Sequence, residues 1–211
     1  MMQPRSEAMP SPPFDNPFCT RRVRPGAIPF HFPAGDSAEQ LLERLRANQW
    51  RGALIGPHGS GKSTLLATLE PHLVKNGREI QRLTLRDQQR WMPKAFARHK
   101  TLNERTLVIV DGYEQLNYLA RLFLGWKCTR PGSGLLVTAH KPIKKMPEVF
   151  RTAPSLDLAQ LLTRELLSGC DDRIEITAAE IASAFAQHQE NLRETLFALY
   201  DLYEARKKSS F

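Results

Sequence analysis

The spacing of apolar and polar residues along this chain predicts alternating strands and helices. Residues 106–111 read Thr-Leu-Val-Ile-Val-Asp, an aliphatic run typical of a strand buried on both faces of a parallel sheet. Helical patterns lie between the apolar runs, among them a stretch at about 87–99, which Pro93 interrupts, and a helix at about 113–127. We therefore expect an α/β fold in which helices cover both faces of a parallel sheet, in three layers. Strands are predicted at about 52–55, 79–85, 106–111, 134–138 and 149–151.

The pattern changes after Pro154, beyond which only helical periodicity remains, with residues such as Leu192 and Leu199 at helical spacing. This predicts a small C-terminal subdomain that is all helical. An earlier helix is expected to begin near Asp36 or Ser37, whose polar side chains suit an N-cap. The C-terminal helices are predicted at about 155–168, 177–188 and 190–206.

A glycine-rich loop follows the apolar residues 53–55 and precedes an apolar helix. Its sequence over 56–63, Gly-Pro-His-Gly-Ser-Gly-Lys-Ser, matches the Walker A pattern GxxxxGK[ST]. In this context the backbone N–H groups and the helix N-terminus form a cradle for phosphate oxygens. A glycine turn that matches by chance is the alternative, but the pattern and its flanks favour nucleoside triphosphate binding. The predicted nucleotide-binding residues of the loop are Gly56, Pro57, His58, Gly59, Ser60, Gly61, Lys62, Ser63 and Thr64.

The glycines, the lysine and the last serine of this loop each have a physical role. Lys62 is expected to reach the β- and γ-phosphates, and Ser63 to ligate Mg²⁺. Gly56, Gly59 and Gly61 allow a close approach of the backbone that a Cβ would obstruct. The cofactors implied are therefore ATP and Mg²⁺.

Two acidic residues follow the most hydrophobic predicted strand. Asp111 ends that strand, where open α/β sheets place ligand groups, and is the Walker B candidate that would act on Mg²⁺ mainly through water. The alternative is an Asp that merely begins a turn. Glu114 is the candidate base for the attacking water, with Gly112 giving the backbone freedom to turn it inward. A first-turn acid that stabilises the next helix is the alternative for Glu114.

Thr138 ends the next predicted strand, where its hydroxyl would lie near the γ-phosphate and help to position water. His140 lies two residues further on and either senses phosphate or is an ordinary surface group. The sequence thus predicts Lys62, Glu114 and Thr138 as catalytic residues, and Ser63 and Asp111 as magnesium ligands.

Composition narrows the class of protein. The 211 residues, 41% of them hydrophobic, suffice for one core with a small accessory. A net charge of +8 favours an anionic partner, either nucleic acid or protein. The odd number of distant cysteines, at 19, 128 and 170, builds neither a disulfide framework nor a CxxC zinc site. No apolar run approaches the roughly 20 residues that span a bilayer, and no signal peptide is evident, so we expect a cytoplasmic protein.

These motifs together resemble an AAA+ ATPase, within the additional-strand, catalytic-glutamate class of P-loop proteins. The resemblance rests on Walker A at 56–63, Walker B at 107–111, the polar strand end and the helical tail. The family pattern implies that Thr138 is sensor 1 and that Arg193, near the start of the last helix, is sensor 2 and points back at the nucleotide. A surface arginine paired with a neighbouring glutamate is the alternative for Arg193.

The resemblance implies three parts. Residues 1–34 form a Pro- and Arg-rich arm that is partly ordered near 27–33, residues 35–153 form the P-loop core, and residues 154–206 form a lid-like helical subdomain. Because the apolar segment that contains Ile28 and Phe30 precedes the core as comparable segments do in AAA+ proteins, it is expected to cover the adenine.

Two departures from the family pattern affect activity and assembly. Gly112 occupies the position where common AAA+ members place the catalytic acid, so hydrolysis is expected to be slow or to need activation. The stretch between Thr138 and Phe150 is too short for the usual helix that carries an arginine finger, which leaves only Arg130 and Arg151 as loose candidates. Ring assembly and the oligomeric state therefore stay open.

A basic segment follows the second predicted strand. Arg86, Arg90, Lys94 and Arg98 recur every four residues around Trp91. This segment could bind nucleic acid, with the cations on phosphates and the Trp91 ring stacked on bases. The alternative is a solvated basic face with Trp91 turned into the core.

Three functions compete on these residues. The leading hypothesis is an ATPase module whose nucleotide state moves the C-terminal helices and changes the affinity for a macromolecular partner. A small-molecule or nucleotide kinase is the second, because the same cradle positions a γ-phosphoryl for transfer. A nucleotide-dependent binding switch with negligible turnover is the third, motivated by Gly112.

Overall fold

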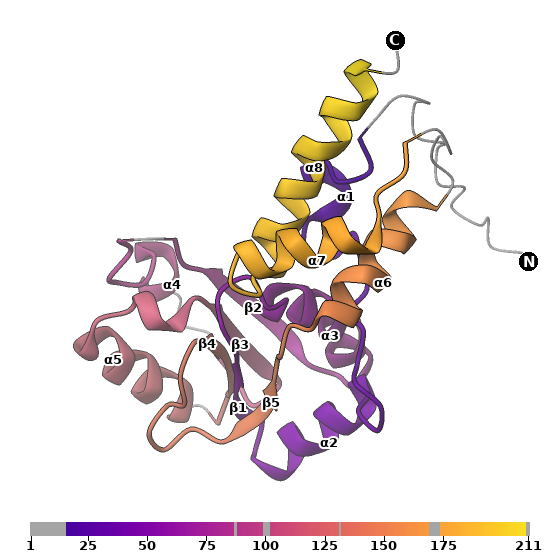
Figure 1. The fold of residues 1–211 in the computed structure, drawn as a ribbon. Helices are drawn as coiled ribbons and strands as arrows, with labels where there is room; N and C mark the ends of the chain where they lie inside the picture. The colour runs from indigo at the N-terminus through magenta and orange to yellow at the C-terminus, as the bar shows by residue number, and fades with distance from the viewer. Residues whose placement is uncertain (1–15, 87, 99–101, 131, 169–173, 210–211) are drawn as a thin grey trace, which may run out of the picture.

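One five-stranded sheet forms the centre of the computed structural model, which describes residues 16–86, 88–98, 102–130, 132–168 and 174–209 (Figure 1). All pairings between neighbouring strands are parallel, and the order across the sheet is β2-β3-β4-β1-β5. The strand after Walker B, β4, is thus inserted between β1 and β3. The strands are β1 (Arg51–Ile55), β2 (Glu79–Thr84), β3 (Thr106–Asp111), β4 (Gly134–Ala139) and β5 (Glu148–Arg151).

Helices cover both faces of this sheet (Figure 1). On one face, α2 (Ala38–Ala47) and α3 (Lys62–Lys75) share a core cluster with strand residues such as Leu54. On the other face, α5 (Tyr118–Thr129) shares a cluster with residues such as Ile55. Because successive strand residues face opposite sides, a strand covered on both sides must be apolar throughout, which explains the uninterrupted runs. The predicted three-layer α/β class is confirmed.

The helices between β2 and β4 differ from the prediction. In the described part of the 87–99 stretch only α4 (Lys94–Arg98) is helical, and it begins directly after Pro93, whose fixed φ suits a helix start. The helix predicted at 113–127 is split into a 3₁₀ turn, η1 (Tyr113–Gln115), and α5. The Asn117 side chain accepts the N–H of Ala120 at 2.8 Å and caps α5, so the helix starts five residues late.

The C-terminal region is helical, as predicted, and contains α6 (Leu156–Leu167), α7 (Ala178–Gln187) and α8 (Leu192–Ser209). Thr177 and Glu180 form a reciprocal capping box at the start of α7. The inner sides of these helices form a third apolar cluster, separate from the two that cover the sheet. Figure 1 shows the three helices grouped at one end of the sheet.

The described part of the N-terminal arm runs from the C-terminal helices to the sheet. It contains the short helix α1 (Thr20–Val23), although its Pro-rich composition predicts little regular structure. Phe18 is buried and packs edge-on against Tyr203 of α8, with ring centroids 6.2 Å apart. Further on, Phe30 packs against Phe150 of β5 at 5.8 Å. Burial of these rings explains why the arm is ordered.

Candidate phosphate-binding site

The Walker A loop connects β1 to α3, at the carboxyl edge of the sheet. Gly59 and Gly61 have φ angles of +70° and +89°, a region that glycine enters without penalty. Gly56 is glycine for a different reason, since a Cβ there would lie 2.0 Å from the Thr152 hydroxyl oxygen. The loop is therefore held close against the segment that follows β5.

Lys62 turns back onto this loop. Its ammonium group donates hydrogen bonds to the carbonyl oxygens of Gly56, at 2.8 Å, and Pro57, at 2.7 Å. Burial lowers the pKa of Lys62, and the nearby carboxylates of Glu114 and Asp111 partly oppose that shift. A buried cation bonded only to neutral carbonyls is well placed to exchange them for phosphate oxygens.

Thr152 is part of the loop's support, and the sequence analysis did not identify it. Its hydroxyl lies 2.6 Å from the Ser60 hydroxyl, which also donates to the Pro57 carbonyl at 2.8 Å. Its backbone N–H donates to Ile55, which ends β1. No local motif marks Thr152, because it reaches the loop only through the pairing of β5 with β1.

The other predicted nucleotide-binding residues follow the course of the loop. Pro57 and His58 are exposed, whereas Ser63 and Thr64 lie half-buried in the first turn of α3. Backbone N–H groups at this helix start have no partner within the helix, which is the feature that binds phosphate.

Asp111 ends β3 beside the loop and both of its carboxylate oxygens are engaged. One oxygen accepts a hydrogen bond from Thr138 at 2.9 Å, and the other lies 3.3 Å from the Arg82 guanidinium. Arg82 also pairs with Glu70 of α3 at 2.6 Å. The sequence analysis did not single out Arg82; the pairing of β2 with β3 sets it opposite Ile109, from where its side chain reaches Asp111.

Thr138, at the end of β4, is buried and its hydroxyl serves the neighbouring strand. It donates to Asp111 and accepts the backbone N–H of Gly112 at 2.8 Å. Its visible role is thus to orient the Asp111 carboxylate, and the predicted contact with water or the γ-phosphate stays a prediction.

Glu114 lies in η1 and faces the loop through two histidines. One of its oxygens is 3.2 Å from His140 Nε2, and the His140 ring packs edge-on against the His58 ring at 5.6 Å. The other oxygen, Oε2, is buried and has no hydrogen-bond partner among the described residues. Burial lowers the pKa of His140; Lys62 and His58 act in the same direction, while Glu114 opposes the shift.

Gly112 leaves no room for an acid immediately after Asp111. Its φ is +89°, and a Cβ there would lie 2.9 Å from the Leu85 carbonyl oxygen. The chain turns at this glycine, and the Glu114 carboxylate beyond it acts on the pKa of Lys62 together with that of Asp111.

The start of α8 touches the Walker A loop, but through Asn191 rather than Arg193. The Asn191 side chain accepts the N–H groups of Arg193 and Glu194, and its oxygen lies 1.7 Å from where a Cβ of Gly59 would be. Arg193 is exposed, with its guanidinium 5.9 Å from the Phe197 ring centre. Its contact with a nucleotide therefore stays a prediction.

The 27–33 segment passes the loop on another side. A Cβ at Gly61 would lie 3.5 Å from the Phe30 ring, and the Phe30 N–H donates to the Thr68 hydroxyl of α3 at 3.0 Å. Ile28 packs with the C-terminal helices instead. Phe30 thus lies beside the loop, and the predicted role of this segment in covering the adenine stays a prediction.

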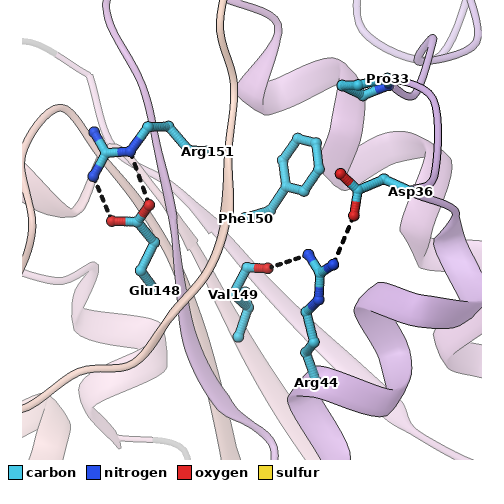
Figure 2. Close-up of a pocket in the computed structure, with 7 residues that line it drawn as sticks. All are labelled: Pro33, Asp36, Arg44, Glu148, Val149, Phe150 and Arg151. Carbon is cyan, nitrogen blue, oxygen red and sulfur yellow. Dashed lines mark hydrogen bonds and ion pairs between the residues drawn. The ribbon is translucent and has the colours of Figure 1, made fainter.

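The loose arginine-finger candidates are engaged elsewhere. Arg130 stacks over Trp126 at 5.5 Å. Arg151 pairs twice with Glu148, at 2.8 and 2.5 Å, in a pocket of about 400 Å³ between β5 and α2 (Figure 2). In the same pocket Arg44 pairs with Asp36 at 2.7 Å, so the four charged side chains that line it form two ion pairs.

The residues around the loop suit a magnesium ion bound together with phosphates. Within the described residues, no three His, Cys, Asp or Glu side chains are grouped so as to hold a metal by themselves. Mg²⁺ is commonly held by one or two carboxylates beside substrate phosphates, for which Asp111 and Ser63 are the donors present. The unpartnered Oε2 of Glu114 adds an acceptor at the same edge.

The fold and this site define a P-loop NTPase-like α/β core with a helical C-terminal region. No protein-family model matches the chain, and no curated protein matches it. Among solved structures, the chain is similar to C. elegans PCH-2, with a TM-score of 0.35 and 12% sequence identity over 81% of this chain and 66% of that chain. A likeness this weak shows neither a family nor a function for this chain. Across the described parts of the chain, no helix combines the length and apolar character needed to cross a bilayer.

Proposed function

We propose that this chain is an ATPase that binds Mg-ATP at the Walker A loop and hydrolyses it. The observation that carries the proposal is the convergence of Lys62, from the loop after β1, with Asp111 and Glu114, from the end of β3 and the turn after it, on one edge of a parallel sheet. Open α/β sheets bind ligands at this edge. A fourth residue, Thr138 of β4, ties its strand to the end of β3 by its hydrogen bonds to Asp111 and Gly112.

Each residue has a distinct part in the proposed reaction. The Lys62 ammonium exchanges its loop carbonyls for β- and γ-phosphate oxygens. Ser63 and Asp111 would hold Mg²⁺, which neutralises charge on those oxygens. The unpartnered oxygen of Glu114 accepts the proton of the attacking water, while His140 holds the other oxygen.

We further propose that residues 154–206 act as a lid on the core at 35–153, as in AAA+ proteins. The contact between Asn191 and Gly59 supports this, because it joins the start of α8 to the loop that would bind phosphate. A nucleotide that reshapes the loop would then bind with different affinity to the two conformations of the protein in which the lid is positioned differently. Such a difference in affinity is the requirement for coupling. Arg193 would contribute by leaving Phe197 for the γ-phosphate.

Calorimetry and a turnover assay test the proposal. Lys62→Ala should weaken Mg-ATP binding by the loss of a charge-assisted contact of about 1.5 to 3 kcal/mol. Lys75→Ala, which removes an exposed lysine from the far end of the same helix, is the matched control and should bind normally. If the unaltered protein takes up neither ATP nor GTP in the presence of magnesium, the proposal is refuted.

Gly112 supports a second candidate, a nucleotide switch with negligible turnover, because the usual place for the catalytic acid cannot hold a side chain. Glu114→Gln separates the two. Loss of turnover by about 100-fold or more, with ATP still bound, supports catalysis by Glu114. Unchanged turnover and unchanged ATP retention support the switch. Transfer of the γ-phosphoryl to an added acceptor would instead indicate a kinase.

A further inference from the structure

Helix α5 is apolar on its outer side as well as its inner side. Its inner residues, such as Leu124, are buried in the core against β4. On its outer side Tyr118, Leu119, Leu122 and Trp126 are 73, 65, 53 and 56% exposed. A helix at the surface of a globular core ordinarily carries polar residues there. We call these four side chains the outer α5 face.

A neighbouring segment enlarges this surface. The Trp91 ring, 43% exposed, stacks on Phe123 with centroids 6.2 Å apart and planes inclined by 29°. Phe123 in turn contacts Trp126 at 6.0 Å. The backbone is fixed at the same place, because the Asn117 N–H donates to the Arg90 carbonyl at 3.0 Å. Trp91 therefore extends the outer α5 face, and Figure 1 shows α5 at the periphery, away from the C-terminal helices.

The two segments that carry this surface contain basic residues and no acidic ones. Residues 88–98 and 117–130 contain no Asp or Glu, but contain Arg90, Lys94, Arg98, Arg121, Lys127 and Arg130. The Arg130 guanidinium lies 5.5 Å over the Trp126 ring, so at least one of these cations borders the apolar side chains directly. A second copy of this chain would bring the same cations to the contact, and like charges oppose such pairing. Charge complementarity therefore indicates an acidic occupant.

We propose that the outer α5 face docks an acidic amphipathic helix of a partner protein. Tyr118, Leu122 and Trp126 are spaced i, i+4, i+8, and this spacing extends over about 12 Å, which matches two turns of a facing helix. Gly125 lies on the same side, and a Cβ there would meet nothing within 4 Å, so a facing backbone can approach closely.

Single-stranded nucleic acid fits the surface less well. Base stacking needs exposed aromatic rings, yet Leu119 and Leu122 are aliphatic and two exposed rings are already stacked on side chains of this protein. Apolar side chains of a facing helix pack against Leu and Trp alike. The proposal is independent of ATP hydrolysis, since none of its residues belongs to the phosphate-binding site.

The test is a selection of displayed helical peptides of about 20 residues against the full chain, long enough to stay helical when bound. Expected binders carry apolar residues at i, i+4 and i+7 with Asp or Glu at the flanks. The consensus peptide, made synthetically, should lose about tenfold or more in affinity toward Leu122→Ser and Trp126→Ser, measured by fluorescence anisotropy. Val74→Ser, which changes an apolar residue of similar exposure on α3, is the matched control and should bind normally.

Charge and specificity provide the remaining outcomes. Arg130→Glu should lower the affinity for the consensus peptide, and the affinity of the unaltered protein for the peptide should fall as the salt concentration is raised. The proposal is overturned if no helical peptide is enriched, if the enriched peptides lack acidic flanks, or if Trp126→Ser binds as well as the unaltered protein. It is equally overturned if a single-stranded oligonucleotide competes at this face more tightly than the peptide, or if the free chain dimerises through Trp126.

Discussion

A glycine, and not an acidic residue, follows Asp111 in this chain. Replacement of Gly112 by alanine tests whether the structure requires glycine there. Two effects oppose a side chain at this position. The φ of +89° is strained for any L-residue, and the new Cβ would lie 2.9 Å from the Leu85 carbonyl oxygen. Leu85 cannot easily retreat, because its N–H donates to the Asp111 carbonyl at 2.8 Å.

The expected loss of stability has two parts. The left-handed backbone conformation costs about 1 to 2 kcal/mol for a residue with a Cβ. The overlap with backbone adds a further overpacking cost of about 1 to 3 kcal/mol, because Leu85 and the β2–β3 pairing must shift. Gly77→Ala separates the two, since Gly77 has a φ of +76° but nothing within 4 Å of its added Cβ. Gly77→Ala should therefore show only the first part.

Urea unfolding of the unaltered protein, Gly112→Ala and Gly77→Ala measures both parts of the loss of stability. Gly112→Ala should lose more free energy of unfolding than Gly77→Ala by about 1 to 3 kcal/mol. Gly112→Glu should be destabilised in the same way and should gain no turnover, because the acid is placed at the cost of moving Asp111. Equal losses in the two alanine variants would show that the Leu85 contact does not constrain Gly112, and faster hydrolysis by Gly112→Glu would refute the assignment of Glu114.

Three further predictions concern residues around the phosphate-binding site. Thr138→Val should cost about 1 to 3 kcal/mol of stability and weaken Mg-ATP binding, because the half-buried Gly112 N–H loses its acceptor and the Asp111 carboxylate loses a donor, whereas Thr138→Ser should retain both; equal behaviour of the two variants contradicts this. The pKa of His140 is lowered in the folded protein, so the unfolded chain binds a proton more readily. The free energy of unfolding should therefore fall as the pH drops below 6.5 towards the folded pKa, and His140→Gln should reduce this fall. An unaltered pH profile of unfolding in His140→Gln counts against this prediction. Phe30→Ala should weaken ATP binding, because the Phe30 ring lies beside Gly61, whereas Ile28→Ala, which alters packing against the C-terminal helices, is the control; unchanged affinity of Phe30→Ala in calorimetry removes the role in covering the adenine.

The elements that the sequence predicted well are those with an unbroken local signal. β3 is aliphatic over its whole length because both of its faces are buried, and the Walker A loop is marked by glycines that its own backbone angles require. The start of α5 was predicted too early, because the pattern of apolar residues does not distinguish a 3₁₀ turn from a helix. Only the cap at Asn117 separates them.

The residues that support the site were beyond reach of the sequence. Thr152, Arg82 and Asn191 each contact the Walker residues from a distant stretch, through strand pairing or the docking of α8. None of them lies in a motif, and a threonine, an arginine and an asparagine are ordinary surface residues by composition. Their positions depend on the order of the strands and on the placement of the C-terminal helices, which hydrophobic periodicity does not specify.

The Walker A loop is also the place where the outer parts of the chain meet the core. Phe30 of the N-terminal arm lies against Gly61, and Asn191 at the start of α8 lies against Gly59. The arm and α8 are themselves joined, because Phe18 packs against Tyr203. A nucleotide that moved either glycine would therefore disturb both contacts at once, and the two segments would respond as one body. On this reasoning the proposed coupling between nucleotide and the C-terminal helices would begin in the loop's own packing, and it would persist in a variant that lacks the Arg193 side chain.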